Sequence, residues 1–394
     1  MELLEPKSKP QKRKPPLLFR LLAFLLTLAL VLGAMFLVVN RDRFNMDSLR
    51  RWFQYRTLER NESGLAESFP YSGGSTNSFA TLNNGLLVSS PQSIQLYSGD
   101  GTLLLDQPVS MDHPVIDSNT KTALVYDAGG TSLYVFSGGA QQFSLSLREG
   151  ESFLSARLND AGEMVVVAQQ SGFKGTATVY DNSFAATLRV KLSSRFILDA
   201  ALSPDGRSMV LLTIGTQGSQ FDTQAEFYRL SRTEEDIEPD AVCSLGSDVS
   251  LGLRWTSGGV WVLGENSLSI LDADGTVQTN YSYSGRYLKG FSLDGDGYAA
   301  LLLGKYRAGS TADLVVVDED GQTASYSLGE QVFSLSAAGK YIALLSAGRL
   351  DIFRSDLTPY RSLEITQGAR RVIQRSDGST MLMNANTAHL YIPE

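Results

Sequence analysis

The side chains best suited to acid–base, nucleophilic or metal chemistry are scarce in this chain of 394 residues. It contains two histidines, His113 and His389, and one cysteine, Cys243. Zinc sites combine several Cys and His ligands, and a catalytic triad needs a histidine beside its nucleophile. We therefore expect structural roles for both histidines. A single cysteine excludes an internal disulfide, and we expect Cys243 to be a small buried apolar residue in a strand.

Acidic residues supply the remaining chemistry, and three turns share the pattern D-x-D-G, at residues 272–275, 294–297 and 318–321. A calcium-binding EF-hand loop needs further oxygen ligands and a closing glutamate at its twelfth position, and none of the three continues in this way. Asp and Gly are also the residues that tight hairpin turns favour. The pattern therefore predicts hairpin turns in preference to metal sites.

Enzyme motifs are equally scarce. The sequence contains no G-x-S-x-G elbow, no P-loop and no G-x-G-x-x-G between a strand and a helix. Glycosidases use paired carboxylates, but no spacing marks such a pair here. We therefore predict no catalytic residue, no cofactor and no metal.

Composition indicates the elements that must carry these residues. Hydrophobic residues make up 43% of the chain, charged residues make up 19%, and glycine occurs 36 times. The hydrophobic content suffices for a large core, while the low charge and the many glycines disfavour a disordered chain, a coiled coil or a helix bundle. A turn-rich all-β fold is favoured.

Beyond residue 64, a turn rich in Asp, Asn and Gly recurs between short apolar strands. Its eight copies have a mean spacing of about 42 residues, the period of a propeller blade. A second hairpin follows the copies, so each unit is a four-stranded antiparallel blade. We predict a closed eight-bladed β-propeller over residues 65–394, with seven blades as the alternative.

The last unit is one strand short. After its first hairpin only AHLYIPE remains, whereas residues 65–71, LAESFPY, precede the first unit at the place of a fourth strand. Pairing this N-terminal strand with the last blade would remove both exposed sheet edges. We predict that the ring closes in this way.

An apolar segment precedes the repeats. Residues 17–39 form a run of 23 positions that only Arg20 interrupts, after a basic tail at residues 1–16. As a helix the run is about 34 Å long, enough to cross the hydrocarbon core of a membrane. It is longer than the apolar part of a cleaved signal peptide, and no A-x-A site follows. We predict a transmembrane helix that acts as a single-pass signal-anchor.

Charge indicates the orientation of this segment. Six Lys or Arg residues lie in residues 1–20 and six in residues 41–60, but the first cluster is denser, and a large C-terminal domain crosses largely regardless of its flanking charge. Residues 65–394 carry 22 basic and 36 acidic residues, which argues against nucleic acid as a partner. We predict a protein of the cell membrane with a cytoplasmic N-terminus and an extracytoplasmic propeller.

Residues 40–64 form the predicted juxtamembrane stalk. Within it, residues 45–60 predict a short helix with Leu49, Trp52 and Phe53 on one face and arginines beside them. Such a helix suits the headgroup region of a membrane, and a plain solvated stalk is the alternative.

Binding residues are predicted from the loops. In a propeller, loops between the second and third strands share one rim with loops between blades. The longest of the former are predicted at residues 171–177, 215–224 and 304–311. Aromatic and Arg side chains often anchor protein interfaces, and the alternative is that these loops are simply solvated. The predicted partner-binding residues are Phe173, Lys174, Arg195, Phe196, Phe221, Arg286, Tyr287, Tyr306, Arg307, Arg370 and Arg371.

Several stretches together resemble a bacterial family. They are the anchor, the stalk ending in SFPYSG, residues 113–136 (HPVIDSNTKTALVYDAGGTSLYVF), and the SPDG and SGGVWVLG turns. Over nearly its whole length the chain is similar to a family of unknown function, single-pass membrane proteins with a WD-repeat or YVTN-like propeller ectodomain. The resemblance implies fold and topology but no catalytic or binding residue. The WD dipeptide of eukaryotic scaffolds is absent.

These features predict a membrane-anchored extracytoplasmic binding or scaffold module of the bacterial cell envelope, with a protein or glycan partner and without catalysis. One alternative is a sensor subunit, but residues 1–16 are too few for a signalling domain, so it would need a partner subunit. The other alternative is a propeller-type hydrolase or dehydrogenase, which the scarcity of histidine disfavours.

Overall fold

A computed structural model of the chain describes residues 21–22, 24–28, 30–32, 35, 46–74, 76–231, 238–366 and 368–393. The chain divides into two compact units, Met1–Arg56 and Thr57–Glu394. The relative placement of the two units is not determined.

The first unit contains the basic tail at residues 1–16 and the predicted membrane segment at residues 17–39. The tail and much of the segment lie outside the described residues, while the described positions of the segment are helical. Where the structure describes the chain, no helix is both long enough and apolar enough to cross a membrane. The single-pass anchor stays a prediction from the sequence.

Helix α2 spans Met46–Tyr55, which is shorter than the helix predicted over residues 45–60. The chain turns after this helix, and Arg60 pairs with Ala66 in an isolated antiparallel bridge. Because Arg60 takes part in this sheet-like pairing, the helix cannot extend to the predicted end.

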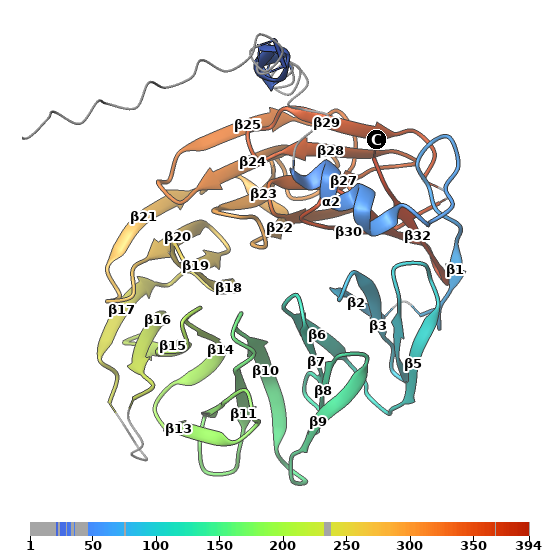
Figure 1. Ribbon diagram of the computed structural model, residues 1–394. Coiled ribbons are helices and arrows are strands. Elements are labelled where there is room, and N and C mark those ends of the chain that lie inside the picture. Colours follow the sequence, from blue (N-terminus) through green and yellow to red (C-terminus); the bar gives the residue numbers. More distant parts are fainter. Residues whose placement is uncertain are drawn as a thin grey trace, which may run out of the picture. The chain divides into compact units, whose positions relative to one another are not determined.

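The second unit is a ring of eight four-stranded antiparallel sheets, numbered here as blades 1 to 8 (Figure 1). The prediction of eight blades is confirmed, and the alternative of seven is excluded. In blades 1 to 7 the four strands follow one another in sequence order. The first strands of the blades lie around the common axis.

The strand bounds follow the repeat seen in the sequence. Blades 1 to 4 consist of β2 (Ser78–Leu82), β3 (Gly85–Ser89), β4 (Ser93–Tyr97), β5 (Leu103–Pro108); β6 (Pro114–Ser118), β7 (Thr122–Asp127), β8 (Ser132–Ser137), β9 (Ala140–Ser146); β10 (Ser152–Leu158), β11 (Met164–Gln169), β12 (Gly175–Tyr180), β13 (Ala186–Leu192); and β14 (Phe196–Leu202), β15 (Ser208–Gln217), β16 (Gln220–Arg229), β17 (Ala241–Gly246). Blades 5 to 8 consist of β18 (Ser250–Thr256), β19 (Gly259–Gly264), β20 (Ser267–Leu271), β21 (Val277–Ser282); β22 (Tyr287–Ser292), β23 (Tyr298–Gly304), β24 (Asp313–Asp318), β25 (Thr323–Ser327); β26 (Ser334–Ala338), β27 (Tyr341–Leu345), β28 (Leu350–Arg354), β29 (Pro359–Leu363); and β30 (Arg371–Gln374), β31 (Thr380–Met383), β32 (Thr387–Tyr391), β1 (Phe69–Pro70).

The hydrophobic pattern explains how the sheets pack. Second strands such as β3, β23 and β27 are apolar and buried along their whole length, because a neighbouring sheet covers each of their faces. Outer strands such as β5, β9 and β21 alternate between exposed and partly buried residues. The core is therefore a series of layers between blades.

Apolar clusters fill these layers. One cluster joins Leu87 of blade 1 to Val125 of blade 2, and another joins Val210 of blade 4 to Val262 of blade 5. Cys243 belongs to the second cluster and is buried, which confirms the expectation from the sequence. Burial raises the pKa of its thiol, so the thiol stays protonated at neutral pH.

The ring closes through the predicted N-terminal strand. Strand β1 pairs antiparallel with β32 as the fourth strand of blade 8. Outside β1, the backbone N–H of Ala66 donates to the carbonyl of Leu390 over 2.8 Å. The closing strand predicted at residues 65–71 is therefore confirmed. Its regular part is short because Pro70 has no N–H to donate.

The ring has two rims that differ in their connections. The turn rim carries the turns between the first and second and between the third and fourth strands of each blade. The loop rim carries the loops between second and third strands and those between blades. Because β1 is a fourth strand, its leading end lies at the turn rim, where Leu65 pairs with Tyr391. The chain therefore enters the ring at the turn rim.

The D-x-D-G segments all form hairpin turns, but they differ in their contacts. Asp272 Oδ1 accepts the backbone N–H of Thr276 over 2.8 Å, and the turn at Asp318 is built in the same way. Asp294 instead pairs with Arg254 of the neighbouring blade over 2.7 Å. Within the described ranges, no group of three or more His, Cys, Asp or Glu residues is placed to hold a metal ion.

Candidate functional site

The structure places all of the predicted partner-binding residues on the loop rim, in three groups. The group on blades 3 and 4 contains Phe173, Lys174, Arg195, Phe196 and Phe221. The group on blades 5 and 6 contains Arg286, Tyr287, Tyr306 and Arg307. Blade 8 carries Arg370 and Arg371, which lie apart from the other two groups.

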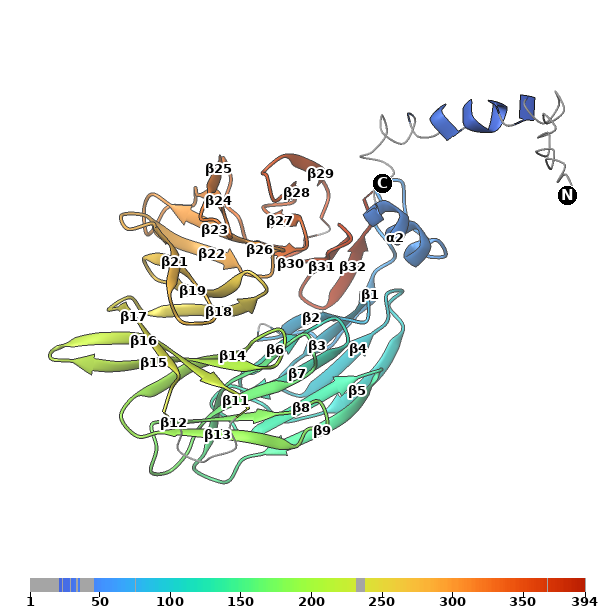
Figure 2. The same ribbon diagram turned by 60° about the vertical axis from the view of Figure 1, so that its left-hand side comes forward.

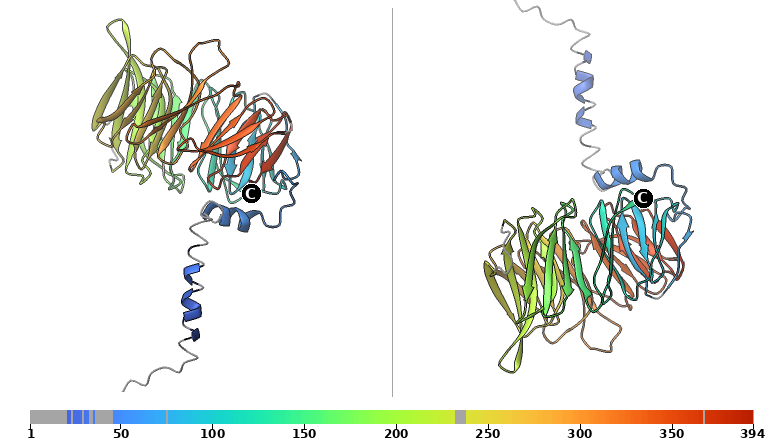
Figure 3. Two further views of the ribbon diagram at one scale, coloured as in Figure 1. Left: turned by 90° about the horizontal axis from the view of Figure 1, so that it is seen from above. Right: turned by 90° about the horizontal axis from the view of Figure 1, so that it is seen from below.

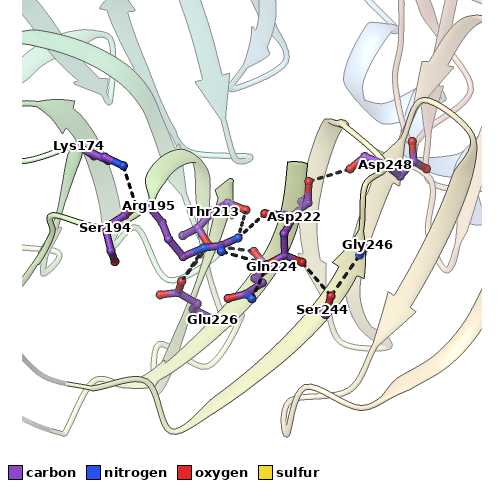
Figure 4. Close-up of polar contacts among 11 residues, drawn as sticks. Lys174, Ser194, Arg195, Thr213, Asp222, Gln224, Glu226, Ser244, Gly246 and Asp248 are labelled. Carbon is purple, nitrogen blue, oxygen red and sulfur yellow. Dashed lines mark hydrogen bonds and ion pairs between the residues drawn. The ribbon is translucent and has the colours of Figure 1, made fainter. Parts of the chain in front are cut away.

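Blades 3 and 4 meet at Lys174 and Phe196. The ammonium group of Lys174 donates to the carbonyl of Ser194 over 2.8 Å (Figure 4) and lies 5.1 Å from the centroid of the Phe196 ring. Phe173 lies in the same loop, and Lys191 Nζ is 5.7 Å from the centroid of its ring. This geometry pairs cations with aromatic rings, a contact of about 0.5–1 kcal/mol at exposed sites.

Arg195 differs from its neighbours because its side chain points inward. Only 17% of the side chain is exposed, and Nη1 lies 3.1 Å from Asp222 Oδ2. Its Nε donates to Thr213 Oγ1 over 2.9 Å and lies 3.7 Å from Glu226 Oε1 (Figure 4). Arg195 was predicted as a partner-binding residue, but in the folded chain its guanidinium is held by these buried acceptors.

Asp222 collects further donors around this guanidinium. Gln224 Nε2 donates to Asp222 Oδ2 over 2.6 Å, and Ser244 Oγ donates to Asp222 Oδ1 over 3.1 Å (Figure 4). Glu226 accepts the hydroxyl of Tyr228 over 2.8 Å, and burial together with this carboxylate raises the pKa of Tyr228. The network thus fixes β16 to β15 and β17.

Sequence reasoning missed this network, although β16 contains a signal for it. In the segment QFDTQAEFYR, alternate positions from 222 to 228 hold Asp, Gln, Glu and Tyr. Alternate residues of a strand lie on one face, so this pattern predicts a polar stripe inside a blade. A buried polar stripe requires partners from neighbouring strands.

The hairpin formed by β15 and β16 extends beyond the sheet that carries it (Figure 2). Its pairing continues to Gln217 opposite Gln220, whereas β14 stops pairing at Ile214 and β17 at Thr223. Residues 215–222, which we call the finger, therefore lack neighbouring strands. Phe221 in the finger is 63% exposed. Figure 3 shows the finger and the C-terminus at opposite rims.

Blades 5 and 6 carry a second exposed cluster. Tyr306 is 64% exposed, and Lys305 Nζ lies 5.5 Å from the centroid of its ring. Lys289 donates to the backbone carbonyl of Arg307, and Arg286 donates to the hydroxyl of Tyr281. Lys289 and Arg286 therefore donate their hydrogen bonds to neutral oxygens.

Apart from Arg195 and Lys191, the cations on the loop rim of blades 3 to 6 that are described above share one electrostatic property. Among the described residues, none of Lys174, Arg286, Lys289, Lys305 and Arg307 lies within 4.0 Å of a carboxylate oxygen. Turn-rim arginines do have such partners, as in the 3.7 Å contact of Arg207 with Asp205. We call these five cations, with the exposed rings of Phe196, Phe221, Tyr287 and Tyr306, the cationic arc.

Charged residues around the axis are paired across blades. Arg157 of blade 3 lies 3.5 Å from Asp117 of blade 2 and 2.8 Å from Asp199 of blade 4. Burial raises the pKa of Asp117, and the charge of Arg157 opposes this shift. Because both carboxylates share one guanidinium, their geometry serves to join blades and does not provide a free acid–base pair.

The two histidines lie apart. His113 is exposed in the loop between blades 1 and 2, where its backbone N–H donates to Asp127 Oδ1 over 2.7 Å. His389 lies in β32 of blade 8, and burial lowers the pKa of its imidazole. Blade 1 separates them, so the structure does not bring them together.

A small open depression lies between blades 4 and 5. Its lining consists mainly of Thr223, Asp248, Ser250, Ser267 and Ser269. Asp248 is already engaged there, because its carboxylate accepts Ser267 Oγ over 3.0 Å. The rings of the cationic arc do not line this depression. The depression is therefore not a pocket that these rings enclose.

A model of a family of unknown function, DUF5711, matches residues 58–389. The chain belongs to DUF5711. The match begins after α2 and ends within β32, so it follows the propeller of this DUF5711 protein. No curated protein matches the chain.

Two solved structures are similar to this DUF5711 protein. The C-terminal WD40 domain of Sif2 is 11% identical with a TM-score of 0.56, and the match covers 84% of this chain and 97% of that one. BamB from Moraxella catarrhalis is 13% identical with a TM-score of 0.51, covering 83% and 98%. At such identities the likeness shows only that this chain shares the propeller fold.

Proposed function

We propose that this DUF5711 protein is a membrane-anchored, extracytoplasmic propeller of the bacterial cell envelope that holds a partner on its loop rim. One observation carries the proposal. The chain enters the ring at the turn rim, where Leu65 pairs with Tyr391, whereas the cationic arc lies on the opposite rim. A tether attached at the turn rim leaves the arc free of the chain's own connection to the membrane.

The anchor itself is inferred from the sequence. Residues 17–39 are apolar over a length that suits a membrane, and basic residues precede them. On α2, the side chains of Leu49, Trp52 and Phe53 are 43%, 59% and 64% exposed. Exposed aromatic residues next to arginines favour a helix that lies in the headgroup region.

The ion pairs of the buried acidic residues favour binding over catalysis. The buried carboxylates that an enzyme would need are engaged in the fold, Asp117 and Asp199 with Arg157, and Asp222 with Arg195. In contrast, the cations of the arc are not ion-paired with any described carboxylate, and the rings of the arc are exposed. Exposed aromatic and cationic residues on a rigid frame are typical of protein-binding surfaces.

The anchor is tested with the full chain in bacterial membranes. We expect it to stay in the membrane fraction after an alkaline carbonate wash. A C-terminal tag should be digested by protease added to spheroplasts, while an N-terminal tag should be protected. Release by the wash, or protection of the C-terminal tag, would contradict the proposed topology.

The binding surface is tested by alanine substitution in the full chain. We expect the variant Phe173→Ala/Phe221→Ala/Tyr306→Ala/Arg307→Ala to lose partner recovery and to keep its melting curve. The matched control is Leu104→Ala/Val277→Ala, because both side chains are exposed on the turn-rim side, by 55% and 42%. Equal recovery with the two variants would move the site to another surface.

A further inference from the structure

The cationic arc carries positive charge that the folded chain does not neutralise. Lys174 donates to the carbonyl of Ser194 and Lys289 to that of Arg307, so both ammonium groups keep their full charge. The domain around them is acidic, with 36 acidic and 22 basic residues in residues 65–394. Covering these cations with an uncharged surface would cost desolvation without compensation. A partner that covers the arc must therefore bring carboxylates or other anions.

The same arc exposes apolar surface. Phe196, Phe221, Tyr287 and Tyr306 are 50%, 63%, 44% and 64% exposed, and Leu251 at the loop-rim end of β18 is 48% exposed. On the loop rim of blades 1 to 3, the described residues include no large hydrophobic side chain of comparable exposure. A partner that fits the arc must therefore combine anionic with apolar or aromatic groups.

The shape of the arc favours an extended chain over a small molecule. The depression between blades 4 and 5 is small and lined mainly by polar residues, and the finger rises beside it. Small ligands usually occupy concave, mostly apolar pockets. The exposed apolar side chains of blades 4, 5 and 6 instead form an open surface of the kind that protein segments bind.

We propose that the cationic arc binds an acidic segment of a protein partner, in which carboxylates face Lys305 and Arg307 and apolar side chains pack on Phe221 and Tyr306. This inference rests on the proposed function, because it names the chemistry of the partner at the same rim. An acidic segment with apolar residues can pair with the cations and also cover the exposed rings. A polymer that is only charged can pair with the cations but cannot cover the rings.

The network at the base of the finger positions Phe221 for this contact. Asp222, the next residue, is only 7% exposed and accepts from Arg195, Gln224 and Ser244. Thr223 Oγ1 also donates to the carbonyl of Asp248 over 2.8 Å. These bonds fix the strand on which Phe221 stands, so less conformational freedom is lost when a partner binds.

The test is a selection from a random dodecapeptide phage library on the full chain in detergent micelles. The arc variant is Phe221→Ala/Tyr306→Ala/Lys305→Glu/Arg307→Glu. The turn-rim control is Leu104→Ala/Val277→Ala/Lys121→Glu/Lys340→Glu, which likewise removes two exposed apolar side chains and reverses two positive charges. Melting curves of both variants are compared with that of the unchanged chain, and Kd is measured for the enriched peptides after synthesis.

We expect enriched peptides with net negative charge and aromatic or aliphatic residues. Their Kd should rise at least about tenfold on the arc variant, equivalent to about 1.4 kcal/mol, and stay within about twofold on the turn-rim control. If the arc variant does not fold, Lys305→Glu/Arg307→Glu alone should still raise the Kd. Higher salt should weaken binding.

Several outcomes would overturn the inference. These are the absence of enrichment, enrichment of neutral or basic peptides, or equal binding to the arc variant. Competition by polyglutamate or by heparin as strong as that of the selected peptide would show that charge alone, or an anionic glycan, is recognised. If one of these results is obtained but a partner still cross-links to position 221, the proposed function is retained. Only the inference that the partner binds through an acidic segment is then rejected.

Discussion

The two rims of the propeller arise from the same repeat but use their polar residues differently. On the turn rim, carboxylates are occupied by their own turns, as Asp181 Oδ1 accepts the backbone N–H of Ser183 over 2.8 Å. Hydrogen bonds from Ser203 and from the N–H of Arg207 lower the pKa of Asp205. On the loop rim, Lys174 and Lys289 of the arc donate to neutral backbone carbonyls, and the rings of the arc are exposed.

The fold accounts for the polar residues of the turn rim but not for those of the arc. A turn-rim aspartate is needed where it stands because the chain reverses there and its N–H groups require an acceptor. Tyr306 and Arg307 lie in a longer loop that does not need an aromatic or a cation to close. The fold does not require an aromatic ring or a positive charge at these two positions. A partner that contacts them would account for both.

Opening the ring should have the largest effect, because both rims depend on its closure. Deletion of residues 65–71 from the full chain removes β1 and leaves the edge of β32 unpaired. We expect a broad, non-cooperative thermal transition in circular dichroism, at a lower Tm than that of the unchanged chain. An unchanged Tm would contradict the closing role of this strand.

Removing the guanidinium below the finger should have the next largest effect. Arg195→Met leaves Asp222 and Glu226 buried without their cation, which costs about 3–5 kcal/mol in the free energy of unfolding. Urea unfolding measures this, with Arg207→Met as control, since the side chain of Arg207 is 84% exposed on the turn rim. The loss should be partly reversed in Arg195→Met/Asp222→Asn. Equal stability of the two single variants would refute the buried role of Arg195.

A pair of small substitutions separates stability from binding. Asp272→Ala removes the acceptor for the N–H groups of Asp274 and Thr276 and should cost about 1 kcal/mol in unfolding without affecting the partner. Lys305→Ala/Arg307→Ala should do the reverse, weakening the partner's binding at an unchanged Tm. Loss of stability in the second variant would mean that these cations serve the fold.

The smallest expected effect comes from His389 beside the closing strand. Burial lowers the pKa of this imidazole below its ordinary 6.5, so the folded state favours the neutral form. The unfolded state then binds more protons, and the stability of the ring falls as the pH drops below about 6.5. His389→Gln should flatten this part of the pH profile in urea unfolding. An identical slope in this variant would assign the effect to other groups.

Most of the fold could be predicted because turns and apolar strands repeat with the period of a blade. The closing strand was predictable for the same reason, since the last unit lacks one strand. The inward turn of Arg195 was not, because its acceptors Asp222 and Glu226 come from β16, and strand pairing across a blade decides where they lie. The contact of Asp294 with Arg254 was missed likewise, because it joins two blades.

The candidate site could be predicted only as a rim. Loop lengths in the sequence are sufficient to place Phe221 and Tyr306 on one side of the ring. Whether a cation is neutralised depends on distances between blades, which no local pattern contains. The structure therefore places most of the predicted residues in the arc, whereas Arg195 is buried, Phe173 lies outside the arc beside Lys191, and Arg370 and Arg371 form a separate pair.

Site-specific photo-cross-linking shows directly whether a partner lies on the loop rim. A photoreactive phenylalanine analogue replaces Phe221, Tyr306 or Val277 in the full chain in its own membrane; all three side chains are exposed, by 63%, 64% and 42%. We predict an adduct of the same mass at positions 221 and 306 on the loop rim, and none at position 277 on the turn-rim side. An adduct at position 277 with none at 221 and 306 would contradict a partner on the loop rim.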